Sequence, residues 1–136
     1  MLNISFQDGQ GLGNQLWLFS AAKSISEKLK VKLNIYGYKK FKGKSFLYLD
    51  NFDNYDYGIE HYKENSQKIE IFNERVFYDH ELKYTLSDFD ERVLNIRNDS
   101  ILKGLFQSEQ YFFGDLKKLK RYIKLKKKVL EENLIE

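Results

Sequence analysis

A glycine-rich stretch near the amino terminus places the tightest constraint on the fold of this chain. Gly9, Gly11 and Gly13 lie between a strand-like run, Leu2–Gln7, and an amphipathic helical pattern. Alternating glycines leave the backbone free to adopt positive φ, and they let a ligand approach the main-chain N–H groups without a Cβ in the way. The stretch therefore predicts a strand, a tight loop and a helix.

The loop itself allows two interpretations. We expect Asn14 at or near the N-cap of the helix, so that the free N–H groups point back into the loop. A Walker A loop requires Lys and then Ser or Thr after its last glycine, where this chain has Asn14 and Gln15. The nicotinamide fingerprint requires a third glycine where Asn14 stands. A capped turn and a phosphate or sugar-nucleotide site are therefore equal alternatives.

The pattern that follows the loop predicts a βαβ unit. Apolar residues recur at three- and four-residue steps through the helix, and Val31, Leu33 and Ile35 then alternate with polar residues as a second strand. Further strands are expected at 45–49, 68–72 and 100–107. We predict an α/β fold, with residues 1–136 forming a single Rossmann-like, three-layer domain with a mainly parallel sheet.

The end of the strand predicted at 100–107 is a second candidate site. Ligands of open α/β sheets bind outside the carboxyl ends of strands, so this end and the glycine loop face one crevice if the strands are parallel. Ser108 followed by the acidic Glu109 predicts a helix start. Gln107 and Ser108 either contribute to that crevice or only cap the helix.

Two stretches, 11–17 and 102–112, carry recognisable motifs. The first reads Gly-Leu-Gly-Asn-Gln-Leu-Trp, and the second reads Leu-Lys-Gly-Leu-Phe-Gln-Ser-Glu-Gln-Tyr-Phe. The first resembles the amino-terminal signature of the α-1,2-fucosyltransferase family (glycosyltransferase family 11). The second is similar to that family's Gly-Tyr-Phe-Gln-Ser-Glu-Lys-Tyr-Phe, from which Leu105 and Gln110 depart. The two motifs occur in family order.

This resemblance implies a fold and an activity. The fold is the N-terminal domain of a GT-B glycosyltransferase, and the activity is inverting transfer of L-fucose from GDP-fucose to the 2-hydroxyl of a galactoside, without a metal or other cofactor. The residues that match the family are Gly11, Gly13, Asn14 and Gln15 for donor binding, and Gln107, Ser108 and Glu109 for an acceptor-side or structural role.

A third family motif, His-x-Arg-Arg-x-Asp, does not occur in this sequence. In related enzymes that motif assists the leaving group from the second half of the protein. The resemblance therefore implies a truncated or split N-terminal domain that is inactive alone, with the C-terminal donor-binding domain absent from this chain and supplied in cis or in trans. No residue here is predicted to be catalytic. The expected partners are GDP-fucose and a galactose-containing glycan, and not nucleic acid.

Two other classes of function stay open. One is a non-catalytic module that binds a nucleotide sugar or a glycan. The other is a nucleic-acid or lipid interaction protein that uses a basic amphipathic helix predicted at 116–130, where Lys and Arg alternate with Leu and Ile. A solvated face on a packed helix explains this pattern more simply, and the net charge of +3 gives no global nucleic-acid footprint.

His80, between Asp79 and Glu81, is the remaining candidate for chemistry. It would serve as a general base, or as a weak metal site with His61, but a surface loop is the favoured explanation. The chain has no Cys, so thiolate metal sites and disulfides are impossible, and we expect no metal. The sequence shows no targeting segment and no apolar run of membrane-spanning length, which predicts a cytoplasmic protein that is at most peripheral to the membrane.

Overall fold

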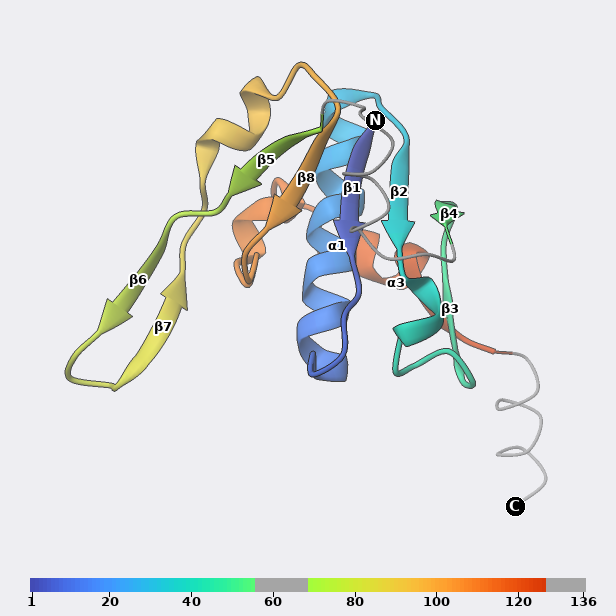
Figure 1. Cartoon of the computed structure of the whole chain (residues 1–136), viewed down its shortest axis with the longest axis horizontal. Helices are drawn as coiled ribbons and strands as arrows, with labels where there is room; N and C mark the ends of the chain where they lie inside the picture. The colour runs from blue at the N-terminus through green and yellow to red at the C-terminus, as the bar shows by residue number, and fades with distance from the viewer. Residues whose placement is uncertain (56–68, 127–136) are drawn as a thin grey trace.

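The computed structural model describes residues 1–55 and 69–126 (Figure 1). Its main sheet has five strands in the order β4-β2-β1-β8-β5, each parallel to its neighbours. These strands are β1 (Leu2–Ser5), β2 (Leu33–Tyr36), β4 (Asp53–Tyr55), β5 (Glu70–Asn73) and β8 (Ser100–Lys103). The predicted α/β class and the mainly parallel sheet are confirmed.

Helix α1 (Leu12–Leu29) connects β1 to β2 and lies against the sheet. The parallel register places Leu2 beside Leu33 and Ile4 beside Ile35, and all four side chains are buried in the core. The short helical elements η2 (Glu91–Asn95), η3 (Glu109–Phe112) and α3 (Lys118–Tyr122) each contact α1. Figure 1 shows α1, η3 and α3 behind the sheet, and the described residues include no helical layer on the opposite face.

Polar side chains inside the sheet explain why β1 and β2 alternate in sequence although they are buried on both faces. Asn34 Nδ2 donates to Asn3 Oδ1 at 3.0 Å, and Asn3 Nδ2 donates to the Ser100 carbonyl at 3.0 Å. These bonds link three neighbouring strands. A buried amide that finds such partners avoids most of the cost of leaving water, so polar positions here do not mark an exposed face.

The helix predicted at 116–130 is confirmed for Lys118–Tyr122 only, and it is wrong from Ile123 to the last described residue, Lys126. Helix α3 ends at Tyr122, and β9 (Ile123–Leu125) pairs antiparallel with β3 (Leu47–Leu49). Main-chain bonds flank the pair, from Asp50 N to the Tyr122 carbonyl (2.9 Å) and from Lys126 N to the Phe46 carbonyl (2.9 Å). Pairing with a distant strand therefore overrides the local helical pattern. Residues 127–130 of the predicted helix lie outside the described residues.

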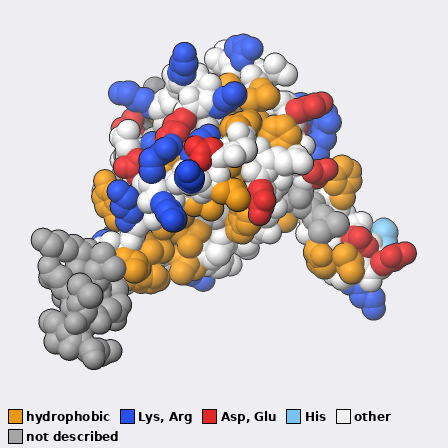
Figure 2. Space-filling view, turned by 180° about the vertical axis from the view of Figure 1, so that it is seen from behind, with side chains coloured by type: hydrophobic (Ala, Val, Ile, Leu, Met, Phe, Trp, Pro, Cys, Tyr) orange, Lys and Arg blue, Asp and Glu red, His pale blue; other side chains and the backbone are white. Residues whose placement is uncertain are grey.

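Strands β6 (Val76–Asp79) and β7 (Tyr84–Ser87) form an antiparallel hairpin that projects from the domain (Figure 1). Figure 2, which shows the opposite side, has hydrophobic and charged side chains exposed together on this arm. Phe77 and Tyr78 are 58% and 54% exposed. The hairpin follows β5, the strand predicted at 68–72, whose first predicted residue lies outside the described residues. The hairpin extends away from the carboxyl ends of β1 and β8.

Candidate functional site

The order of the strands fixes where a ligand can enter the main sheet. From β1 the chain adds β2 and β4 on one side, whereas β5 and β8 lie on the other. In open α/β sheets, ligands bind outside the carboxyl ends of the strands, at the point where the order reverses. The segments that leave β1 and β8 at this point, 9–14 and 104–107, overlap the motifs at 11–17 and 102–112.

A hydrogen bond joins these two segments beyond the carboxyl ends of the neighbouring strands β1 and β8. Gln107 Nε2 donates to Asn14 Oδ1 at 2.6 Å, although the two residues are 93 positions apart. Asn14 is exposed and Gln107 is half-buried, so the pair lies at the protein surface beyond the strand ends. The expected convergence of the glycine loop and the end of the later strand is therefore confirmed.

The first turn of α1 begins earlier than predicted. Gly11 is the N-cap residue and makes no side-chain cap bond, so the prediction that Asn14 caps the helix is wrong. Leu12 and Leu16 both pack against the core one turn apart, which requires helical geometry before Asn14 is reached. The Asn14 amide is turned instead toward Gln107.

The glycines of the two segments differ in what surrounds them. A Cβ added at Gly11 or Gly13 would meet no atom within 4 Å, whereas a Cβ at Gly104 would lie 2.4 Å from the Cβ of Glu74. Gly13 lies inside α1, where glycine costs about 1 kcal/mol relative to alanine. The fold therefore needs Gly104, but it gives no packing reason for Gly11 and Gly13, which leave space for a group from outside the chain.

Gln15 is fully buried and its side chain holds a neighbouring loop. Its Nε2 donates to the Lys40 carbonyl at 3.1 Å, and its Oε1 accepts from Lys42 N at 2.9 Å. This loop follows β2 and carries exposed lysines, of which Lys40 forms an ion pair with Asp8 at 3.2 Å. Gln15 thus positions a basic segment next to the glycine loop.

A buried carboxylate that the sequence analysis did not single out holds the loop after β8. Glu74 is 6% exposed, and its Oε1 accepts from the main-chain N atoms of Leu105 (3.0 Å) and Phe106 (2.8 Å). Its Oε2 accepts from the Tyr111 hydroxyl. These bonds fix Phe106 at φ +51°, just before Gln107. The available signal was an acidic residue directly after a strand.

The network continues from Tyr111 to a second carboxylate. Asp90 N donates to the Tyr111 hydroxyl at 3.1 Å, and Arg92 donates to both carboxylate oxygens of Asp90, at 2.9 and 2.6 Å. The bonds from Arg92 lower the pKa of Asp90 to about 2. Burial, together with the bond to Glu74, raises the pKa of Tyr111. The hydroxyl stays protonated as a donor, so the network positions the loop.

Ser108 and Glu109 take different places in the second motif. Ser108 Oγ accepts from Gln110 N at 3.2 Å and caps η3, so the predicted helix start is confirmed, although the helix is 3₁₀. Glu109 is exposed in the first turn. Of this motif, Gln107 is therefore the residue that contacts the glycine loop.

The candidate at His80 lies at the tip of the hairpin, away from these loops. Asp79 Oδ1 accepts from the main-chain N atoms of Glu81 (2.9 Å) and Leu82 (3.0 Å), which makes a surface turn. The favoured surface-loop interpretation is confirmed. His61 lies outside the described residues. Within residues 1–55 and 69–126, no group of three His, Asp or Glu side chains is arranged to hold a metal ion.

Comparison with protein-family models, curated proteins and solved structures gives no match for this chain. The described helices include none with the length and apolar character needed to cross a membrane. Evidence on function therefore lies in the geometry of the site and in the motifs that meet there.

Proposed function

We propose that this chain is the N-terminal part of a glycosyltransferase of the α-1,2-fucosyltransferase type, and that its glycine loop contacts the diphosphate of the donor. Such an enzyme transfers L-fucose from GDP-fucose to a galactoside 2-hydroxyl with inversion. The observation that carries the proposal is the hydrogen bond from Gln107 to Asn14. It brings together, at the reversal point of a parallel sheet, the two motifs that resemble this family.

The donor side of the site suits an anionic diphosphate. The first turn of α1 presents free main-chain N–H groups and the positive end of the helix dipole. Gly11 and Gly13 leave these groups open to approach. The basic loop after β2, held by Gln15, adds positive charge nearby. In this proposal Gly11, Gly13 and Asn14 contact the donor, and Gln15 acts through the loop that it positions.

The acceptor side is less complete. In this proposal the half-buried Gln107 and the exposed Glu109 contact the acceptor sugar, whereas Ser108 caps η3. Inverting transfer also needs a base for the acceptor hydroxyl and cationic groups for the departing GDP. We assign neither role to a residue of this chain. The proposal accordingly requires a C-terminal domain, in cis or in trans, for catalysis.

Binding of GDP to the purified chain tests the proposal. We expect saturable binding of GDP and GDP-fucose by calorimetry, weakened about 10-fold in Asn14→Ala and Gln107→Ala. Asn98→Ala is the matched control. Asn98 precedes β8, so it lies at the amino ends of the strands, away from the proposed site, and its exposed side-chain amide donates to Glu70. Failure of GDP to bind, or an equal loss in Asn98→Ala, would refute the proposal.

Activity of the chain alone tests the second part of the proposal. We expect no transfer of fucose to lactose in the absence of another domain. Turnover of roughly 1 per second, as in an ordinary enzyme, would contradict the assignment of catalysis to a missing half. Binding without turnover, even after a C-terminal domain is added, would favour the non-catalytic module.

The structure weakens the alternative that this chain binds nucleic acid or lipid through a basic helix. That alternative required a long basic amphipathic helix at 116–130, and the chain leaves helical geometry at Ile123. Helix α3 has five residues, from Lys118 to Tyr122, which is too short for a stable amphipathic surface. We therefore do not propose nucleic acid or lipid as a partner.

A further inference from the structure

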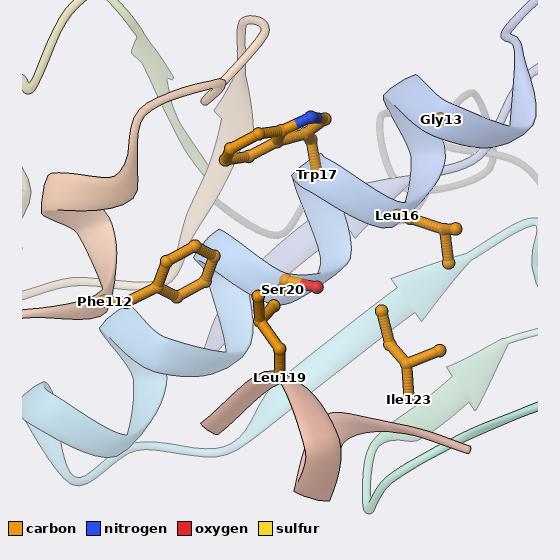
Figure 3. A pocket seen from close by; sticks show the side chains of 7 residues that line it. All are labelled: Gly13, Leu16, Trp17, Ser20, Phe112, Leu119 and Ile123. Carbon is orange, nitrogen blue, oxygen red and sulfur yellow. The ribbon is translucent and has the colours of Figure 1, made fainter. Parts of the chain in front are cut away.

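A pocket of about 220 Å³ lies on the outer side of α1, between this helix, η3 and the segment that contains α3 (Figure 3). Trp17 and Phe112 are stacked on one side, with ring centroids 6.2 Å apart and planes at 26°. Figure 3 shows aliphatic side chains on the other side. The lining residues are Gly13, Leu16, Trp17, Ser20, Phe112, Leu119 and Ile123.

A buried hydroxyl without a partner lies in the middle of this apolar lining. Ser20 is 2% exposed, and its Oγ has no hydrogen-bond partner. Figure 3 shows this oxygen between the aromatic and the aliphatic side chains. A buried hydroxyl without a partner destabilises the fold, because it has lost its hydrogen bonds to water. A ligand that places one donor or acceptor against Ser20 would restore one such bond.

The walls of the pocket are held in place by contacts outside it. The Tyr122 hydroxyl donates to Glu27 Oε2 at 2.7 Å, and Lys118 Nζ donates to Ser24 Oγ at 3.3 Å, so α3 is fixed to α1 at two points. The Trp17–Phe112 stack ties η3 to the same helix. The pocket is therefore formed before any ligand enters, which lowers the entropic cost of binding.

We propose that this pocket binds a small apolar ring that carries one hydrogen-bonding atom, such as a phenol or a cyclic alcohol. A cavity of about 150 Å³ lined by apolar side chains accommodates benzene, so about 220 Å³ accommodates a ring with a few further atoms. None of the lining residues is charged, which excludes a phosphate or a metal ion. The ligand is thus different in class from GDP-fucose. Gly13 borders both this pocket and the proposed donor site, but the inference does not depend on the proposed function.

Intrinsic fluorescence tests this proposal directly, because Trp17 is the only tryptophan of the chain and lines the pocket. The probes are phenol and toluene, which have the same number of heavy atoms but differ in the hydroxyl. Emission is excited at the red edge of the indole band, where neither probe absorbs. We expect saturable changes with both probes and tighter binding of phenol.

Two variants identify the groups responsible. Ser20→Ala is expected to weaken phenol about 2- to 10-fold, the range of one hydrogen bond, and to leave toluene unchanged. Ile123→Phe is expected to fill the pocket and abolish binding of both probes. A thermal shift of the unmodified chain provides a second readout, because a ligand of the folded state raises the unfolding midpoint even where a variant does not fold.

Several outcomes would overturn the proposal. One is an unchanged Trp17 emission and melting temperature with both probes up to their solubility limits. Another is a preference for phenol that survives in Ser20→Ala. A third is an emission spectrum that depends on protein concentration, which would show that a second copy of the chain covers the pocket.

Discussion

The loops that leave β1 and β8 meet in one site, but they are built in opposite ways. The loop after β8 is fixed by a buried carboxylate, Glu74, which approaches so closely that only glycine fits at position 104. The loop after β1 has open space around Gly11 and Gly13. Glycine alone therefore does not mark a ligand site, because the atoms around it decide whether it is needed by the fold or leaves room for a partner.

The largest effect is expected when the fixed loop loses its carboxylate. Glu74→Ala leaves two main-chain N–H groups without their acceptor and removes the bond from the Tyr111 hydroxyl, which keeps only its 3.3 Å bond to the Asp88 carbonyl. This change should lower the free energy of unfolding by about 4 kcal/mol. Urea denaturation measures the change. Glu74→Gln keeps an acceptor for the N–H groups and should lose less than half as much. Equal losses in the two variants would show that the side-chain oxygen does not hold this loop.

A methyl group at Gly104 should be the next most damaging change. Its Cβ would lie 2.4 Å from the Cβ of Glu74, and the φ of +153° is unfavourable for alanine. We expect Gly104→Ala to destabilise the chain by about 3 kcal/mol in the same urea assay. A decrease of less than about 1 kcal/mol in the free energy of unfolding would mean that the loop after β8 rearranges to accept a side chain. Gly104 would then not be required by the fold, and the two loops would not differ in this respect.

The charge network beside the fixed loop should make stability depend on acidic pH. Bonds from Arg92 lower the pKa of Asp90 from 3.8 to about 2 in the folded chain. Because the folded-state pKa lies below the unfolded value, this stabilisation is complete above about pH 4 and is lost as the pH falls toward 2. Its size is about 2 kcal/mol.

Urea midpoints measured between about pH 5 and pH 2 check this dependence. Asp90→Asn removes the titrating group, so its stability should change less over that interval than the stability of the unmodified chain. Parallel curves for the two proteins would assign the acid sensitivity to other carboxylates.

The smallest change in stability, and the only stabilising one predicted here, is expected at Gly13 in the first turn of α1. Gly13→Ala should stabilise the chain by about 0.5–1 kcal/mol, because alanine favours the helix and its methyl group meets no atom. If the donor approaches this position, the same methyl group should weaken binding of GDP in the titration described above. A variant that is more stable and binds GDP normally would separate Gly13 from the donor site.

The sequence predicted the elements whose evidence is local. The alternation of Leu2, Ile4 and Phe6 and the helical repeat after the glycine loop correctly gave β1, α1 and, with Leu33 and Ile35, β2. The segment from Ile123 to Leu125 was predicted as helix because Ile123 and Leu125 satisfy a strand pattern as well as a helical one. Only the distant partner strand β3 decides between them, and no local pattern contains it.

The candidate site could be predicted in part for the same reason. The reversal-point rule correctly placed Gln107 near the glycine loop once the strands were taken as parallel. The sequence did not reveal the role of Glu74, because a single carboxylate after a strand reads as a surface residue until the fold buries it. It also placed the cap at Asn14, since the packing that starts α1 at Leu12 is a tertiary property.

The position of β1 in the sheet has a consequence for biosynthesis. β1 precedes the other four strands of this sheet along the chain and lies at its centre, but its neighbour β8 starts only at Ser100. At about 5–20 residues per second, a ribosome needs several seconds to cover that interval. Until then, one edge of β1 has no partner, and an unpaired edge invites aggregation. Asn14 can meet Gln107 only after both residues have left the ribosome, so the site cannot assemble before β8 and the segment after it have been synthesised.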